Sequence, residues 1–156
     1  MRISSKGRYA LVSMINMAKN YDKGKYITVV SISEKFGISK IYLEQVFALL
    51  KKGGLVISTK GSQGGYQISR MPSEITVFEI PSSIESTLFE KAEETVSELA
   101  PNYEKAIHSL VFNNLDEAIK QSLSSVTLER LVEETDKNAD EQSIMYYIWG
   151  VFYEQL

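Results

Sequence analysis

Residues 28–69 decide the fold, with the sequence TVVSISEKFGISKIYLEQVFALLKKGGLVISTKGSQGGYQIS. Thr28 is a typical N-cap before a short helix over 29–36, and Gly37 is suited to end that helix. Ser39 is placed to cap a second helix. The buried face of this second helix is expected to hold Leu43, Val46, Phe47 and Leu50. Two short helices about three residues apart, with glycine in the turn, predict a helix-turn-helix.

The segment after the second helix predicts a β-hairpin. Gly53 and Gly54 end the helix, and strand-like runs over 55–60 and 66–69 flank the glycine-rich residues 61–65. A phosphate-binding loop is the alternative, but the Walker spacing is missing and no helix is expected directly after the glycines. A hairpin that follows a recognition helix is a wing. The expected fold is therefore mainly α, a winged helix-turn-helix with a two-stranded β wing.

Further helical segments are expected on both sides of this region. The spacing of Leu11, Met14, Ile15 and Ala18 predicts a helix over about 5–21. On the other side, residues 74–86 are expected to form a connector packed on the winged domain, in which Pro81 interrupts any helix. Residues 88–99 are rich in Glu and have only weak helical spacing.

The C-terminal third predicts helices of a different kind. Pro101 suits the first turn of a long helix that runs to about residue 123. Its apolar face is expected to contain Ile107, Leu110, Val111, Leu115, Ala118 and Ile119. Thr127 is expected to cap a helix over 128–134, and a polar break over 136–140 precedes a last helix with a dense aromatic tail. That tail should pack on the core or on another subunit, because it is too apolar for one exposed face.

These elements predict three parts. Residues 1–72 form the winged DNA-binding domain, 73–100 the connector, and 101–156 a helical dimerisation and regulatory region.

Charge is divided unevenly along the chain, although the net charge is only −3. Residues 1–70 hold 12 Lys and Arg against 3 Asp and Glu, whereas residues 71–156 hold 5 against 17. A basic half beside an acidic half is typical of a nucleic-acid-binding module joined to a region that avoids nucleic acid. Chance clustering of surface charge is the alternative interpretation.

Composition excludes several chemistries. The chain has no cysteine, which excludes disulfides, a nucleophilic thiol and thiolate-held metal clusters. The chain has a single histidine, His108, and so offers little for a hydrolytic triad. Several Asp and Glu residues are adjacent in sequence, and these pairs are expected to lie on solvated helix faces rather than to act as catalytic acids and bases. We therefore expect neither an enzyme nor a cofactor-binding or metal-binding protein. Without a bilayer-length apolar run or a signal peptide, a cytoplasmic protein is expected.

The candidate DNA-binding residues lie on the second helix of the motif and around it. Because Leu43 and its partners face the core, Ile41, Glu44, Gln45, Ala48 and Lys52 are expected to face a groove of the DNA. Gln can pair with adenine and Glu can accept from cytosine. The side chains that offer positive charge to phosphates are Arg2, Lys6, Arg8, Lys40, Lys51, Lys52 and Lys60.

Short motifs across the chain resemble the Rrf2 family of bacterial winged-helix repressors. They are SSKGRYA at 4–10, ISE at 32–34, YLEQ at 42–45, GLV at 54–56, KG at 60–61, GGY at 64–66 and VTLERL at 126–131. The resemblance implies that the helix opening at Ser39 reads the major groove through Tyr42, Glu44 and Gln45. It also implies that Lys60, with Gly61 and Gly64 in the wing, approaches the minor groove.

The same resemblance bears on sensing. One branch of the family holds an iron–sulfur cluster through three cysteines in the loop that corresponds to about 86–105, and this chain has none. Residues 141–148 are similar to the end of the cysteine-metabolism repressors (CymR type). That branch lacks the cluster and senses through the enzyme O-acetylserine thiol-lyase.

These observations predict a homodimeric DNA-binding transcription regulator, a repressor that reads a palindromic operator. The dimer is expected to form through Ile107, Leu110, Val111 and Leu115, and the signal is expected to be a metabolite or a partner protein. The alternative is a winged-helix adaptor that binds proteins and does not read DNA.

Overall fold

The computed structural model describes residues 3–21, 26–85 and 99–153. Three helices, α1 (Ser5–Lys19), α2 (Val29–Phe36) and α3 (Lys40–Lys52), form the first half of the winged body. The predicted bounds are confirmed to within two residues. Thr28 Oγ1 accepts a hydrogen bond from Ser31 N at 3.1 Å, and Gly37 ends α2 with φ of 64°. Ser39 occupies the N-cap position of α3, but its side chain makes no capping hydrogen bond.

The wing is the predicted hairpin, formed by β1 (Val56–Thr59) and β2 (Gly65–Ile68). The strands are antiparallel, with Val56 opposite Ile68 and Thr59 opposite Gly65. Gly64 must be glycine, because a Cβ there would lie 2.6 Å from Thr59 O. The wing thus turns tightly at its tip.

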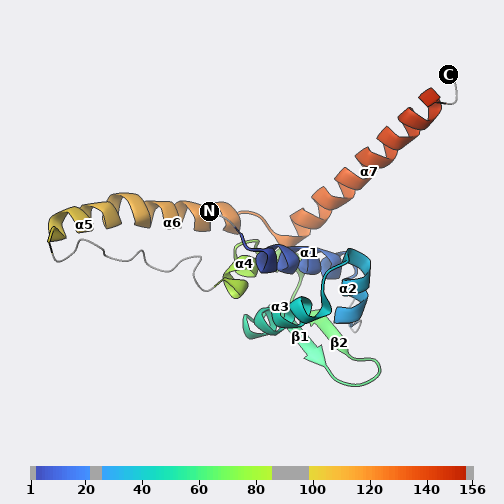
Figure 1. Ribbon diagram of the computed structural model, residues 1–156, viewed down its shortest axis with the longest axis horizontal. Coiled ribbons are helices and arrows are strands. Elements are labelled where there is room, and N and C mark those ends of the chain that lie inside the picture. The colour runs from blue at the N-terminus through green and yellow to red at the C-terminus, as the bar shows by residue number, and fades with distance from the viewer. Residues whose placement is uncertain (1–2, 22–25, 86–98, 154–156) are drawn as a thin grey trace.

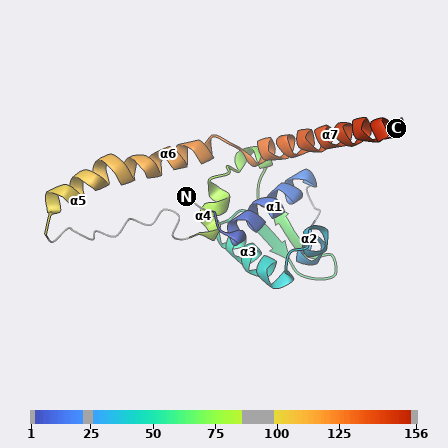
Figure 2. The same ribbon diagram turned by 45° about the horizontal axis from the view of Figure 1, so that its top comes forward.

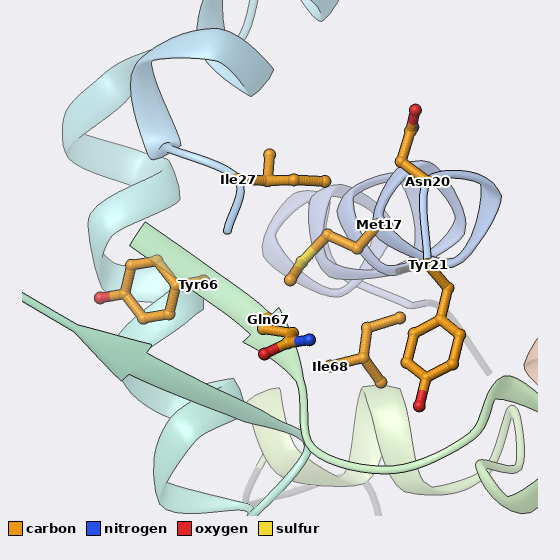
Figure 3. Close-up of a pocket in the computed structure, with 7 residues that line it drawn as sticks. All are labelled: Met17, Asn20, Tyr21, Ile27, Tyr66, Gln67 and Ile68. Atoms are coloured by element: carbon orange, nitrogen blue, oxygen red, sulfur yellow. The ribbon is translucent and has the colours of Figure 1, made fainter. Parts of the chain in front are cut away.

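Strand β2 of the wing is fixed to the segment that precedes α2 and packs against the end of α1. Tyr66 and Ile27 exchange two backbone hydrogen bonds, both of 2.8 Å. In Figure 3, Met17 reaches from α1 toward β2, where Ile68 lies beside Tyr21. The cavity between these side chains is only about 10 Å³, which leaves room for about one water molecule. The wing is therefore rigidly seated at its base.

The core lies between α1, α3, the wing and two short segments that follow it. Its fully buried members include Met14, Leu43, Phe47, Leu50, Ile75, Ile80 and Leu128. All four residues predicted for the buried face of α3 are in this core. Because Leu128 begins α7, the C-terminal third contributes to the same core.

The connector contains a helix that the sequence analysis excluded. After a 3-10 turn, η1 (Pro72–Glu74), comes α4 (Glu79–Ile84), and Pro81 is its third residue. Proline is tolerated there because the N–H groups of a helix's first turn have no acceptor within the helix. The prediction that Pro81 interrupts any helix is therefore wrong. The predicted packing on the winged domain is confirmed, since Ile75, Val77, Ile80 and Pro81 are buried.

Two long arms leave the winged body in different directions (Figures 1 and 2). The first consists of α5 (Pro101–Ile107), the π-helical segment η2 (His108–Phe112) and α6 (Asn113–Ser124). The second is α7 (Leu128–Tyr153), a helix of 26 residues. The predicted break over 136–140 does not exist, because this polar stretch contains neither Gly nor Pro and faces solvent. The Glu-rich segment predicted over 88–99 lies almost wholly outside the described residues.

The two arms meet the body at one junction. Val77 N donates to Val126 O and Leu128 N donates to Ile75 O, both at 2.8 Å. As predicted, Thr127 caps α7, since its hydroxyl accepts from Arg130 N at 3.2 Å. Among the helices of the described residues, none has the combination of length and apolarity that a bilayer span requires.

Candidate nucleic-acid interface

The exposed side of α3 is the centre of the candidate interface. Its buried stripe faces the core, so Ile41, Tyr42, Glu44, Gln45 and Lys52 face solvent, as do Lys40 and Ala48. Ile41 is 68% exposed and Tyr42 is 50% exposed. Figure 1 shows α3 and the wing below α1, on the side opposite to α7. The arrangement leaves this surface free for a large partner such as a DNA duplex.

Within this face, Glu44 and Tyr42 have partners in the chain. Lys40 Nζ lies 3.6 Å from Glu44 Oε1, one helical turn away. Both side chains are more than half exposed, so the pair contributes little stability and is easily exchanged for an external partner. The Tyr42 ring packs edge-on against Tyr9 of α1 with 6.4 Å between centroids. Tyr42 is thus held in place, whereas Glu44 is free to reorient.

The wing presents positive charge beside α3. Lys60 and Gly61 are exposed at the tip, and Gly64 is partly exposed. Gly61 has φ of 106°, a conformation that other residues rarely adopt. Lys51 Nζ donates to Ser58 Oγ at 2.6 Å and so ties the end of α3 to β1. The sequence analysis missed Ser58, because its contact depends on how the hairpin folds back on the helix.

The basic residues at the N-terminus are less closely grouped. Arg2 lies outside the described residues. Lys6 is partly exposed and Arg8 is exposed on the first turns of α1. Arg8 lines a cavity of about 410 Å³ with Tyr9, Phe36 and Ile38, next to the turn between α2 and α3. Arg8 is therefore near the helix-turn-helix, although on a different element from the wing.

An ion pair fixes the end of the wing to the connector. Arg70, two residues after β2, pairs with Glu79 at the start of α4. Glu79 also accepts hydrogen bonds from Thr76, from its backbone N at 2.8 Å and from its hydroxyl at 3.1 Å. Burial acts to raise the pKa of Glu79, but the bonds from Thr76 and Arg70 outweigh it and hold the pKa below the ordinary 4.5. The Glu79 carboxylate is therefore ionised and links the end of the wing to α4.

The predicted dimerisation stripe is unpaired in the single chain. Ile107 is 40% exposed, Leu110 71%, Val111 53% and Leu115 55%. Leu110 and Val111 lie in the π-helical segment, which the sequence pattern did not predict. Farther along the chain, Ile144, Met145 and Tyr146 of α7 are also exposed, and none of these three packs on the core. Both arms therefore carry apolar surface that this chain leaves uncovered.

His108 lies in the same arm, close to a buried carboxylate. Its Nε2 is buried, makes no hydrogen bond and lies 4.0 Å from Glu104 Oε1. The described residues contain no group of three or more His, Cys, Asp and Glu side chains placed to hold a metal. With no cysteine in the whole chain, the donor set does not fit a thiolate-held iron–sulfur cluster.

Comparison with known proteins agrees with this geometry. Residues 3–134 match the model of a family described as Rrf2, iron-dependent transcriptional regulator. The HTH-type transcriptional regulator IscR of Xenorhabdus nematophila is 35% identical over 133 residues, which are 85% of this chain and 80% of that protein.

Two solved structures have a fold similar to that of this chain. CymR, the global cysteine regulator of B. subtilis, has a TM-score of 0.69 at 33% identity, covering 86% of this chain and 98% of the other. T. potens IscR has a TM-score of 0.66 at 31% identity, covering 88% and 90%. The predicted fold class and family resemblance are thus confirmed. The chain belongs to the Rrf2 family of DNA-binding transcriptional regulators, which are not enzymes.

Proposed function

We propose that this protein is a homodimeric repressor that reads an imperfect palindrome with α3 and the wing. The observation that carries the proposal is the exposed face of α3, with Glu44 and Gln45, beside a wing that carries Lys60 at its tip. Gln45 and Glu44 are placed to contact base edges in the major groove, since Gln pairs with adenine and Glu accepts from cytosine. Tyr42 and Ser39 flank these contacts at the start of the helix.

The phosphate contacts are assigned to the basic side chains around that face. They are Arg2, Lys6, Arg8, Lys40, Lys52 and Lys60, and the small residues Gly61 and Gly64 let the wing approach the DNA closely. Lys60 would lie toward the minor groove, where a lysine supplies a point charge. Such contacts give register and affinity, whereas α3 supplies the sequence preference.

The dimer is assigned to the first arm. Leaving a large apolar side chain in water costs roughly 1.5–3 kcal/mol, and four of them are exposed on α5, η2 and α6. A second copy is the natural partner, because regulators of this family are generally dimeric and two-fold dimers are the commonest oligomers. We accordingly divide the chain into a DNA-binding domain (1–72), a connector (73–100) and a dimerisation and regulatory region (101–156).

Sensing is proposed to proceed without an iron–sulfur cluster, since the chain supplies no thiolate. The likeness to the B. subtilis global cysteine regulator supports O-acetylserine thiol-lyase as a candidate partner. Sedimentation of the two proteins at micromolar concentrations, with and without O-acetylserine, tests this. A complex is expected, and its absence under both conditions would leave a small-molecule signal as the alternative.

The proposal for DNA reading is tested by footprinting on fragments selected from the host genome. We expect two protected half-sites about one helical turn, roughly 34 Å, apart. Gln45→Ala and Lys60→Ala should weaken binding, whereas the exposed-lysine control Lys137→Ala on α7 should not. Protection of one unpaired half-site would contradict the dimeric geometry. If the protein is an adaptor that does not read DNA, it should protect no fragment, and Gln45→Ala and Lys60→Ala should lose no function.

A further inference from the structure

A second groove lies away from the wing, between α1, α2 and the beginning of α7. Its volume is about 350 Å³, within the range of pockets that hold small molecules. It is lined by Val12, Ile15, Asn16 and Lys19 of α1, Lys35 and Phe36 of α2, and Thr135 of α7. The groove therefore joins the first helix of the helix-turn-helix to an arm.

One wall of the groove is apolar. Val12 and Ile15 are partly buried, and the Phe36 ring is 39% exposed beside them. Two branched side chains and a phenyl ring offer contact to a short aliphatic or aromatic group. A ligand with such a group would gain about 25 cal/mol for each Å² of apolar surface removed from water.

The opposite end of the groove carries hydrogen-bond donors without acceptors. Asn16 is only 6% exposed, and its Oδ1 accepts from Lys35 Nζ at 2.6 Å. That bond fixes the amide orientation, and among the described residues nothing accepts from the Asn16 Nδ2 group. Among the described residues, the buried side-chain atoms without a hydrogen-bond partner are Ser13 Oγ and His108 Nε2, so the Asn16 Nδ2 group is open to the groove rather than enclosed. Asn16 thus presents an unused donor to the groove.

Lys35 adds an uncompensated charge at the same place. Within the part of the chain that the structure describes, no carboxylate lies within 4.0 Å of its Nζ. The neighbouring Lys19 differs, because it pairs with Asp136 of α7 at 2.5 Å. An ammonium can donate three hydrogen bonds, and Lys35 uses one of them on Asn16. Lys35 Nζ also lies 5.3 Å from the centre of the Phe36 ring. The groove therefore offers one positive charge without a carboxylate partner, beside the N–H groups of the Asn16 amide.

We propose that this groove binds a small organic carboxylate with a short apolar tail, and that the bound acid adjusts the DNA affinity. The carboxylate accepts from Lys35 and Asn16, and the tail lies along Phe36, Val12 and Ile15. The effect on DNA rests on the proposed function. It follows from the ligand's contact with α2, which packs on α3, and with α7. The groove would therefore couple a metabolite to the recognition helix.

Binding is tested first without DNA, by titration calorimetry on the full chain. The probes are 4-methylpentanoate, its neutral amide 4-methylpentanamide, and acetate. We expect the acid to bind at least tenfold more tightly than either other probe, because the amide lacks the charge and acetate lacks the tail. Equal binding of the acid and the amide would overturn the proposal, and so would equal binding of acetate, which would indicate an adventitious anion.

Variants locate the site. Lys35→Met keeps the length of the side chain and should weaken 4-methylpentanoate binding at least tenfold. Lys40→Met, which removes an exposed lysine outside the groove, should not weaken it. Thermal unfolding checks that both variants are folded. Unchanged binding by Lys35→Met would refute the site. A change in sedimentation without a change in acid binding would assign the groove to a second copy and also refute it.

The regulatory step is tested separately on the selected DNA. We expect 4-methylpentanoate to change the affinity of the wild type at least threefold and that of Lys35→Met not at all. If the acid binds but the DNA affinity is unchanged, the regulatory inference fails and the proposed function stands. If the protein binds the acid but no DNA, the proposed function fails and the binding site stands.

Discussion

The winged body buries its large apolar side chains, whereas the first arm exposes several of its own. In the body, Phe47, Leu43 and Leu50 have no exposed surface, whereas Leu110 in the arm is 71% exposed. The body therefore buries the apolar side chains that stabilise it, whereas the arm leaves its apolar stripe uncovered in the single chain. Under the proposed function, this difference separates the part that presents side chains to DNA from the part that brings two copies together.

The sharpest test of the comparison replaces two arm residues by charges. Leu110→Glu with Val111→Glu should give monomers with a folded winged body. The loss of the second binding module should lower DNA affinity by about 10²–10⁴-fold, the size of an avidity effect. Sedimentation and DNA titration measure the two outcomes. The matched control Lys120→Glu changes the net charge by the same two units at an exposed residue of α6 outside the stripe and should remain dimeric. A dimeric double variant would place the interface elsewhere.

The converse test weakens the body. Phe47→Ala removes a ring that is fully buried and packs 4.6 Å from the ring of Tyr66, centroid to centroid. We expect it to lower the free energy of unfolding by about 3–5 kcal/mol, as is usual for such cavities. Leu115→Ala, measured on the monomeric double variant, should cost far less because that side chain is 55% exposed. Comparable losses measured by denaturant titration would mean that the arm has its own core.

The third test varies the salt concentration, because residues 1–70 are basic and residues 71–156 are acidic. If both copies neutralise several phosphates, log K for DNA should fall with log salt at a slope steeper than about −4, taking roughly −0.9 for each phosphate. DNA titrations at several salt concentrations measure the slope, and Lys60→Ala should make it shallower by nearly one phosphate per copy. A nearly flat slope would contradict the assignment of the basic half to DNA.

The smallest effect concerns the ion pair between Arg70, just after the wing, and Glu79 at the start of α4. The pKa of Glu79 is lowered in the folded chain, so its charge stabilises the fold above the ordinary value of 4.5. This contribution is lost as pH falls through the lowered pKa. Glu79→Gln should therefore be less stable than the wild type near pH 7, and the difference should disappear in acid. Thermal unfolding at several pH values checks this, and a difference independent of pH would mean that the charge is irrelevant.

Local patterns were sufficient for most of the body. The N-cap at Thr28, the glycine at 37 and the apolar spacing of α3 are short-range signals, so α2, α3 and the exposed face of α3 could be predicted. The arms were harder. In α7 the polar stretch over 136–140 lacks apolar periodicity, but helix propensity and the absence of Gly and Pro keep it helical.

Other features depend on contacts between distant residues. Lys35 and Asn16 are 19 positions apart, and only the packing of α2 on α1 brings them together. Lys51 meets Ser58 because the hairpin folds back on α3. The π-helical turn at 108–112 has no established sequence signal. The side-chain pairs that complete the sites were for this reason invisible in the sequence.

The junction between Ile75–Val77 and Val126–Leu128 makes the first arm an insertion. The backbone bonds at this junction hold together the two ends of an excursion of 48 residues, 78–125, which includes the core helix α4 and the first arm. Closing a flexible loop costs only about 0.6 kcal/mol more for each doubling of its length. Residues near the tip of the excursion are therefore nearly neutral for the stability of the body. In evolution, the tip can therefore change its length, its residues and the ligands it binds while α3 and the wing keep their geometry.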